Sequence, residues 1–303
     1  MSTKQRDLIG YGNKKPNPSW PNEAKLAVQF VLNYEEGGEY CLLNGDSHSE
    51  NYLWEIVGAE KVYDSRNMNI ESVYEYGSRA GVWRILELFR KHDIKITIYS
   101  VARALEQNHH LVEILKNDGH EIATHGYRWI DYQNYNVKTE REHLLKAIDI
   151  QKKITGYRPL GSYIGRISPN TRRIIAEEGG FIYNSDVYND DLPYWEYYGD
   201  KALLLIPYTL DNNDMKFCTA QGFNTGNDFF EYLKSSFNVL YEEGQTSPKM
   251  MSIGLHCRII GRPGRFESLV KFVNYISNFK DIWVTRRIDI AKHWYKHHKT
   301  DPA

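Results

Sequence analysis

The feature that most constrains the fold of this chain is an alternation of short apolar runs with longer amphipathic segments. The run 26–32 is almost continuously apolar and has the length of a buried strand, whereas 81–92 repeats apolar side chains at helical spacing. Further strands are predicted at 95–101, 121–123, 160–162, 181–184, 203–207, 250–256 and 282–285. Further helices are predicted at 110–116, 140–155, 170–178, 227–243 and 268–278. A β/α alternation with roughly seven core strands predicts a parallel barrel or a doubly wound sheet.

A single domain is expected over residues 1–303, with a core at about 26–290 and an N-terminal arm at 1–25, because no repeat or linker-like tract divides the chain. The longest apolar runs are far shorter than the ~20 residues of a membrane-spanning helix, so no membrane partner is expected. Residues 1–7 carry charges that no apolar stretch follows. That pattern argues against a secretory signal and predicts a cytoplasmic protein.

Charge and cysteine content narrow the classes of partner. Lys and Arg total 38 against 39 for Asp and Glu. The chain therefore has no excess of positive charge to hold a nucleic-acid backbone, and no nucleic-acid partner is expected. The cysteines at 41, 218 and 257 lack C-x-x-C spacing, which favours reduced thiols over disulfides.

Polar side chains stand out where predicted strands end, and α/β folds build their sites from those loops. Glu35 and Glu36 directly follow the first strand. Such a pair can supply a general base and a metal ligand or orienting group, although such a pair taken alone is more often a solvated acidic turn. His125 and His256 also follow strands. Each can act as an acid, a base or a ligand, or can be a structural histidine that bonds a loop carbonyl.

Three arginines, Arg258, Arg262 and Arg265, lie in a Gly- and Pro-containing loop after His256. Planar guanidinium groups bind carboxylates, ureas and imides through paired hydrogen bonds, although loop arginines also form subunit contacts or surface ion pairs. Single aromatic residues in the predicted loops are candidates for the walls of a site. They are Tyr34, Trp129, Tyr163 and Trp195.

Taken in order, these loops resemble the motifs of the polysaccharide deacetylases, carbohydrate esterase family four. Residues 33–37, Asn-Tyr-Glu-Glu-Gly, are similar to the family's Thr-Phe-Asp-Asp-Gly, and 125–129, His-Gly-Tyr-Arg-Trp, to its His-Ser/Thr-x-x-His. Arg158-Pro159 matches the family's Arg-Pro, and Leu255-His256 matches its last motif. The resemblance implies a distorted (β/α)7-type barrel. It also implies that Glu35 is the base, that Arg158 orients the acid pair and that His256 is the general acid.

The departures from the family pattern concern the metal site. The family's metal ligands correspond to Glu36, His125 and Trp129, and an indole nitrogen is only a donor. A catalytic zinc normally has three protein ligands. We therefore expect no cofactor, with at most weak, adventitious zinc binding, and hydrolysis without a metal.

A closer resemblance is to the cofactor-independent allantoinases, a branch of this family that opens the hydantoin ring of allantoin in urate breakdown. It extends over nearly the full length, including residues 6–12, 74–83 and 189–195. It implies a small ureide substrate and a homo-oligomer, with a tetramer as the suggested form. Glu35 or Glu36 would be the base, and His125, Trp129 and the arginines would polarise the carbonyl. Arg166 would contact the substrate, and Asp186 would orient a catalytic side chain or serve only as a turn residue.

Two alternatives remain at this stage. One is a deacetylase of N-acetylglucosamine in peptidoglycan or chitin, against which the lost metal ligand and the missing export signal both speak. The other is a non-catalytic scaffold of the same fold. The retained Glu35, Arg158 and His256 argue against a scaffold.

Overall fold

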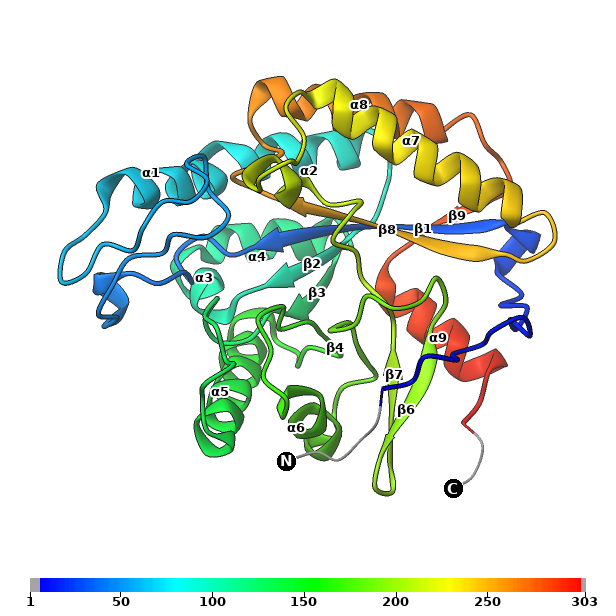
Figure 1. Cartoon of the computed structure of the whole chain (residues 1–303), viewed down its shortest axis with the longest axis horizontal. Coiled ribbons are helices and arrows are strands. Elements are labelled where there is room, and N and C mark those ends of the chain that lie inside the picture. The colour runs from blue at the N-terminus through cyan, green and yellow to red at the C-terminus, as the bar shows by residue number, and fades with distance from the viewer. Residues whose placement is uncertain (1–5, 301–303) are drawn as a thin grey trace.

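The computed structural model describes residues 6–300, in which a mostly parallel, 9-stranded sheet curls into a half-barrel with helices on its outside (Figure 1). Strand β1 (Leu26–Tyr34) lies next to one end strand of this sheet, and every residue in it is buried. β8 (Lys249–His256) pairs with β1 in parallel and places Asn33 opposite His256. On the other side of β1, β9 (Ile282–Val284) pairs with the first half of the strand and β2 (Thr97–Ser100) with the second half.

From β2 the sheet continues through parallel strands to an antiparallel edge. These strands are β3 (Glu121–Thr124), β4 (Gly161–Ser162), β5 (Tyr183–Asn184), β7 (Lys201–Leu205) and the edge strand β6 (Tyr194–Tyr198). The predicted barrel is confirmed, and each predicted strand has a counterpart. The placement of Tyr34 and Trp195 in loops is wrong. Strand β1 extends through Tyr34, and the aromatic run Tyr-Trp-Glu-Tyr-Tyr around Trp195 fits the pleated surface of an edge strand.

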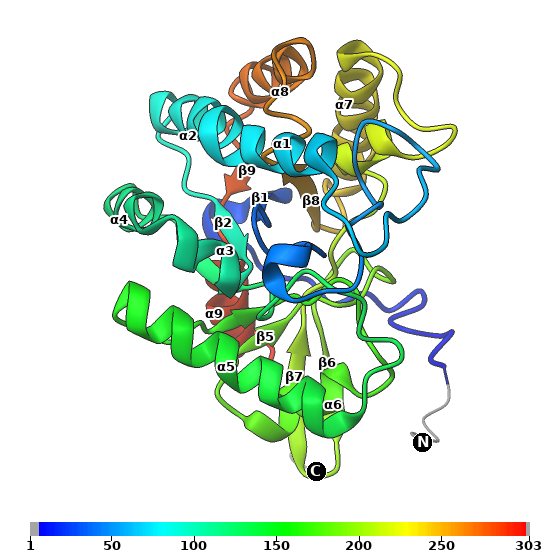
Figure 2. The ribbon, with the colours of Figure 1, turned by 90° about the vertical axis from the view of Figure 1, so that its left-hand side faces the viewer.

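The helices fall into two groups on the outside of the sheet (Figure 2). One group is α1 (Met68–Tyr76), a π-helical turn (Gly77–Gly81), α2 (Val82–Lys91), α7 (Gly226–Glu243) and α8 (Pro263–Ile276). The remaining helices are α3 (Ala102–Gln107), α4 (His109–Asn117), α5 (Val137–Thr155), α6 (Thr171–Glu178) and α9 (Arg287–His297). All six predicted helices are present, whereas α1, α3 and α9 were not predicted.

Two predicted helices begin earlier than expected, because of their capping residues. Helix α5 begins at Val137, since the Asn136 side chain accepts a hydrogen bond from the Thr139 amide. Helix α8 begins at Pro263, a residue whose fixed φ suits the first helical position.

The half-barrel is not closed by a continuous ladder between β7 and β8. The segment after β7 meets β8 through a single bridge between Asn213 and Gly254. Arg287, which is fully buried, ties this seam together with hydrogen bonds from Nη1 to Ser252 Oγ at 2.7 Å and from Nη2 to the Pro207 carbonyl at 2.8 Å. Buried guanidinium donors thus stand in for the missing strand pairing.

Two sequence predictions about the chain as a whole can be compared with the structure. The three cysteines are buried, free thiols, as predicted. Between residues 6 and 300, no helix combines the length and the apolar character needed to cross a membrane. Residues 1–5 of the predicted N-terminal arm lie outside the described residues.

Candidate active site

The carboxyl ends of three parallel strands bring Glu35, His125 and His256 together. Glu35 follows β1, His125 follows β3, and His256 ends β8. Side chains alternate along a strand, and those of Val31 and Asn33 face the inside of the barrel. Glu35 continues this inward series and is only 1% exposed.

Three cationic or titratable groups surround the Glu35 carboxylate. His125 Nε2 lies 3.2 Å from Oε1, and His256 Nε2 lies 3.6 Å from the same oxygen. Arg258 Nη1 donates to Oε2 at 2.6 Å. Burial alone would raise the pKa of Glu35, but Arg258, and then His256 and His125, outweigh it and hold this pKa well below its usual range. Glu35 is therefore an ionised carboxylate.

Arg258, rather than Arg158, is the arginine that holds the carboxylate of the acid pair. Its guanidinium is fully buried, packs over the Tyr74 ring at 4.2 Å, and donates from Nε to the Leu53 carbonyl at 3.1 Å. Arg158 instead forms an ion pair with Glu178 at 2.9 Å and lies over Phe181. The prediction that Arg158 orients the acid pair is wrong, because its side chain faces α6 rather than the barrel interior.

Asp214, which the sequence analysis did not select, controls His256. Its Oδ1 lies 2.6 Å from His256 Nδ1, and its Oδ2 accepts hydrogen bonds from the amides of His256 and Ile260. Burial disfavours the charged imidazole, but Asp214 and then Glu35 outweigh that effect, so the pKa of His256 is raised. His256 can therefore serve as a proton donor near neutral pH. The available signal was an acid closely following the predicted strand 203–207.

His125 is held by the loop that follows β4. Its Nδ1 donates to the Tyr163 carbonyl at 2.9 Å, which leaves Nε2 facing Glu35. Asp186 fixes that loop, since its carboxylate accepts hydrogen bonds from the amides of Ile164 and Gly165. A Cβ on Gly165 would lie 3.1 Å from His125 Cε1, and the φ of this residue is +78°, so glycine suits the position on both counts.

Glu36 points the opposite way from Glu35. Its Oε2 accepts the Glu35 amide at 2.9 Å, and its carboxylate packs so closely on Gly77 that a Cβ there would collide with it. Burial, together with the neighbouring Glu35 and against the effect of Arg258, raises the pKa of Glu36 to about 7. Glu36 lies on the helix side of the sheet, away from the two imidazoles.

The three positions that correspond to the family's metal ligands do not form a ligand set. Glu36 faces Gly77, the Nε2 of His125 faces Glu35, and the Trp129 indole packs against Arg258 at 5.2 Å. Between residues 6 and 300, no group of three His, Cys, Asp or Glu residues is arranged to hold a metal ion. The donors present therefore do not fit a resident metal.

The residues predicted to contact substrate divide into two groups. Trp129, Tyr163 and Arg166 lie around the Glu35 cluster, with the Tyr163 ring 5.0 Å from that of His125 and Arg166 over the Trp129 ring at 4.9 Å. The other predicted contacts lie elsewhere. Tyr34 bonds Ser78 on the helix side, Trp195 bonds the His298 carbonyl, Arg262 stacks on Tyr76, and Arg265 pairs with Glu55.

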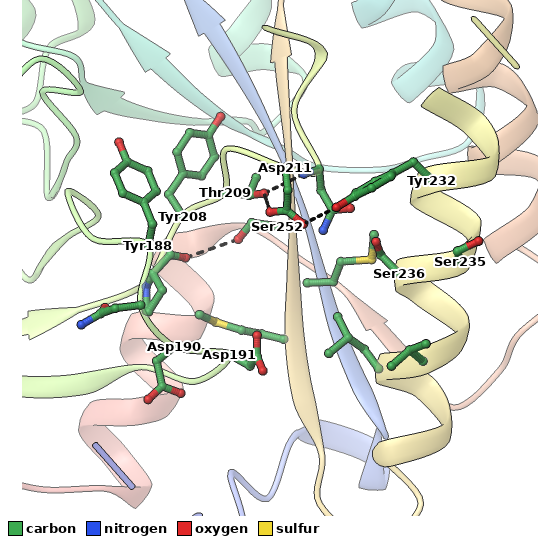
Figure 3. A pocket seen from close by; sticks show the side chains of 17 residues that line it. Tyr188, Asp190, Asp191, Tyr208, Thr209, Asp211, Tyr232, Ser235, Ser236 and Ser252 are labelled. Carbon is green, nitrogen blue, oxygen red and sulfur yellow. Dashed lines mark hydrogen bonds between the residues drawn. The ribbon is translucent and has the colours of Figure 1, made fainter. Parts of the chain in front are cut away.

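A groove lies along the seam beside β8 (Figure 3). Its volume is about 660 Å³, and its lining includes Asp190, Asp191 and Asp211 but none of the predicted site residues. Volume alone would place the site here, but the buried, convergent titratable groups are those around Glu35. We assign the candidate active site to the latter on that chemistry.

Comparisons with known proteins agree with the fold. The sequence profile of the polysaccharide deacetylase family matches residues 64–177. A Schizosaccharomyces pombe protein that carries the polysaccharide deacetylase name is 42% identical over 97% of this chain and 98% of its own length. Two crystal structures, a probable polysaccharide deacetylase from Pseudomonas aeruginosa PAO1 and Puue allantoinase, each match with a TM-score of 0.97 and 55% identity. The matches cover 98% and 99% of this chain, respectively, and 100% of each neighbour. The chain belongs to the polysaccharide deacetylase family.

Proposed function

We propose that this protein is a cyclic amidase that opens the hydantoin ring of allantoin to give allantoate, without a resident metal. The observation that carries the proposal is the arrangement of an ionised, buried Glu35 against two imidazoles and one guanidinium. The similarity to Puue allantoinase, at 55% identity over 99% of this chain, supports the choice of substrate.

The reaction is attack by water on a ring amide carbon. Glu35 removes a proton from the water while the water oxygen forms a bond to the amide carbon. Negative charge develops on the carbonyl oxygen, and hydrogen-bond donors are needed to stabilise it. Arg258 is a donor within reach, since its Nη2 has no hydrogen-bond partner among the described residues. His125 can donate from Nε2 only when both of its ring nitrogens carry a proton, because Nδ1 already donates to the Tyr163 carbonyl. The ring C–N bond then breaks, and His256 protonates the departing nitrogen.

Glu35 is the better candidate for the base, although Glu36 has the pKa nearer to neutrality. A general base must first lie within reach of the proton that it removes, and pKa is the second criterion. Only Glu35 lies among His125, His256 and Arg258, whereas Glu36 packs against Gly77. Arg258 keeps Glu35 ionised, so the base is in its active form throughout the neutral range.

The test is a paired assay of ureide hydrolysis and of acetate release. We expect the purified protein to convert allantoin and to leave acetylated chitooligomers unchanged. Acetate release without allantoin turnover would instead support the deacetylase alternative, and inactivity on both would support a scaffold. Prolonged treatment with a metal chelator should leave allantoin turnover unchanged. Loss of activity on chelation that zinc restores would overturn the metal-free mechanism.

A further inference from the structure

The groups of the candidate active site are sealed from solvent. Glu35 and His125 are each 1% exposed, Arg258 is 0% exposed and His256 is 5% exposed. No substrate can reach the Glu35 carboxylate while these exposures persist. Some part of the chain must move aside when a substrate enters.

The segment Glu50–Glu55, here called the cover segment, lies against this cluster. It belongs to the long connection between β1 and α1, at the left of Figure 1. The Leu53 carbonyl accepts a hydrogen bond from Arg258 Nε, while the same guanidinium holds Glu35. The Tyr52 ring stacks on Trp129 at 6.0 Å. One arginine thus links the cover segment directly to the catalytic carboxylate.

Side chains, rather than a backbone ladder, hold the cover segment in place. Within the described part of the chain, the amides of Leu53, Trp54 and Glu55 donate no hydrogen bond. Leu53 also has a φ of +51°, a conformation that is unfavourable for a residue with a Cβ. Opening the segment therefore breaks no hydrogen bond of these three amides, although it exposes the Leu53 and Trp54 side chains, which are each only 5% exposed in the closed form.

Glu50 is the anchor of the cover segment. Its carboxylate is fully buried, Oε1 accepts the amides of Asn51 and Tyr52, and Oε2 pairs with Arg166 Nη1 at 3.0 Å. Arg166 reaches it from the loop after β4 and also lies over the Trp129 ring. A second ion pair, between Glu55 and Arg265, is more exposed, with side-chain exposures of 37% and 21%.

We propose that the cover segment opens to admit the substrate at every turnover, and that the Arg166–Glu50 ion pair is the latch that holds it closed over Glu35. Glu50 is thus a positioning residue that acts through the cover segment. This inference rests on the proposed function only in its statement about turnover, since opening and closing can be measured without any substrate.

The first test is amide hydrogen exchange of the full chain without substrate, in the wild type and in Glu50→Gln. Glutamine keeps an oxygen for the two amides but places a neutral group beside Arg166. We expect exchange across 50–55 to accelerate about tenfold, the size expected for loss of one charge-assisted hydrogen bond, while β1 keeps its protection. Arg166→Lys should give an intermediate acceleration, because lysine keeps the charge but not the stacking.

The matched control is Glu55→Gln, which makes the same charge change at the more exposed ion pair of the same segment. It should alter exchange by less than about twofold. Equal acceleration in Glu55→Gln, or none in Glu50→Gln, would overturn the assignment of the latch. Acceleration that also includes β1 would show that Glu50 supports the whole fold, and would overturn it as well.

A crosslink tests whether opening is needed for turnover. Glu55→Cys and Arg265→Cys, bridged by a short bismaleimide, would fix the cover segment while leaving Glu50 and Arg166 unchanged. We expect kcat for allantoin to fall more than about tenfold on bridging. Unchanged turnover in the bridged form would contradict opening at every turnover. If the wild type has no activity on allantoin, the proposed function fails, while the exchange result still decides the latch.

Discussion

Glu35 and Glu36 are neighbours in sequence but belong to two physically different regions. The inside of the half-barrel presents Glu35 to Arg258, His256 and His125, so its charge is compensated on every side. The layer between sheet and helices presents Glu36 to Gly77, with Oε1 lacking any hydrogen-bond partner among the described residues. Burial is nearly equal at the two positions, at 1% and 5% exposure.

The difference shows that charged partners, not burial, decide how a carboxylate behaves in this fold. The pKa of Glu35 lies well below its usual range and that of Glu36 is raised to about 7, although both groups lose their contact with water. Glu35 is thus ionised throughout the neutral range, whereas Glu36 titrates near neutrality. Four substitutions test this division.

Replacing Glu35 should have the largest effect. Glu35→Gln keeps the size of the side chain but removes the base and the negative charge that Arg258 neutralises. We expect kcat for allantoin to fall about a thousandfold. Steady-state kinetics measures this effect, and circular dichroism checks the fold. Retention of more than about a tenth of the activity would contradict the assignment of Glu35 as the base.

Arg258→Lys should come second. Lysine keeps a positive charge, but it cannot donate to the Leu53 carbonyl and to Glu35 at the same time, and it cannot pack flat on the Tyr74 ring. We expect kcat/KM to fall about thirtyfold, as one charge-assisted hydrogen bond is lost. The pKa of Glu35 should also rise, so activity should fall at a higher pH on the acid side than in the wild type. Arg265→Lys, at the exposed ion pair with Glu55, is the matched control and should change kcat/KM little.

Asp214→Asn should mainly move the pH profile. Asp214 raises the pKa of His256, and the proposed reaction needs the protonated imidazole, so activity is present below that pKa and lost above it. Removing the charge of Asp214 lowers this pKa, and the alkaline limb of kcat/KM should move to lower pH. Asp211→Asn, in the same segment but bonded to Thr209 and Tyr232, should leave the limb in place. An unshifted limb in Asp214→Asn would exclude His256 as the group that titrates.

The sequence predicted those parts of the site that depend on strand ends. Glu35, His125 and His256 were found because each directly follows an apolar run, and parallel strands bring their carboxyl ends to one edge of the sheet. Arg166 and Trp129 also lie beside the cluster, as expected from the resemblance. The half-barrel itself followed from the alternation of strands and helices.

The parts that could not be predicted depend on long-range folding of side chains and loops. Arg158 matched a motif, but its side chain faces Glu178, while Arg258 reaches Glu35 from a loop more than 200 positions away in sequence. Asp214 acts only because a short 3-10 helix, Asp214–Cys218, places it beneath His256. Whether Glu35 or Glu36 faced the site depended on which of them continued the inward series of β1.

Glu36→Gln should have the smallest effect on activity and a distinct effect on stability. Its side chain faces away from the imidazoles, so we expect kcat/KM to change by less than about threefold, in contrast to the large loss expected for Glu35→Gln.

The effect on stability follows from the pKa of Glu36, which is raised in the folded state. The stability of the wild type is therefore present in full below the pKa that Glu36 has in the unfolded chain, and it falls as pH rises towards about 7. The permanently neutral glutamine removes that fall. The variant should therefore gain about 2 kcal/mol over the wild type between pH 5 and pH 8, measured by denaturant unfolding. Glu39→Gln is the matched control, because burial also raises the pKa of Glu39 to about 7. If only Glu39→Gln flattened the pH dependence, Glu36 would already be ionised in the folded chain, and the contrast between the two sides of β1 would disappear.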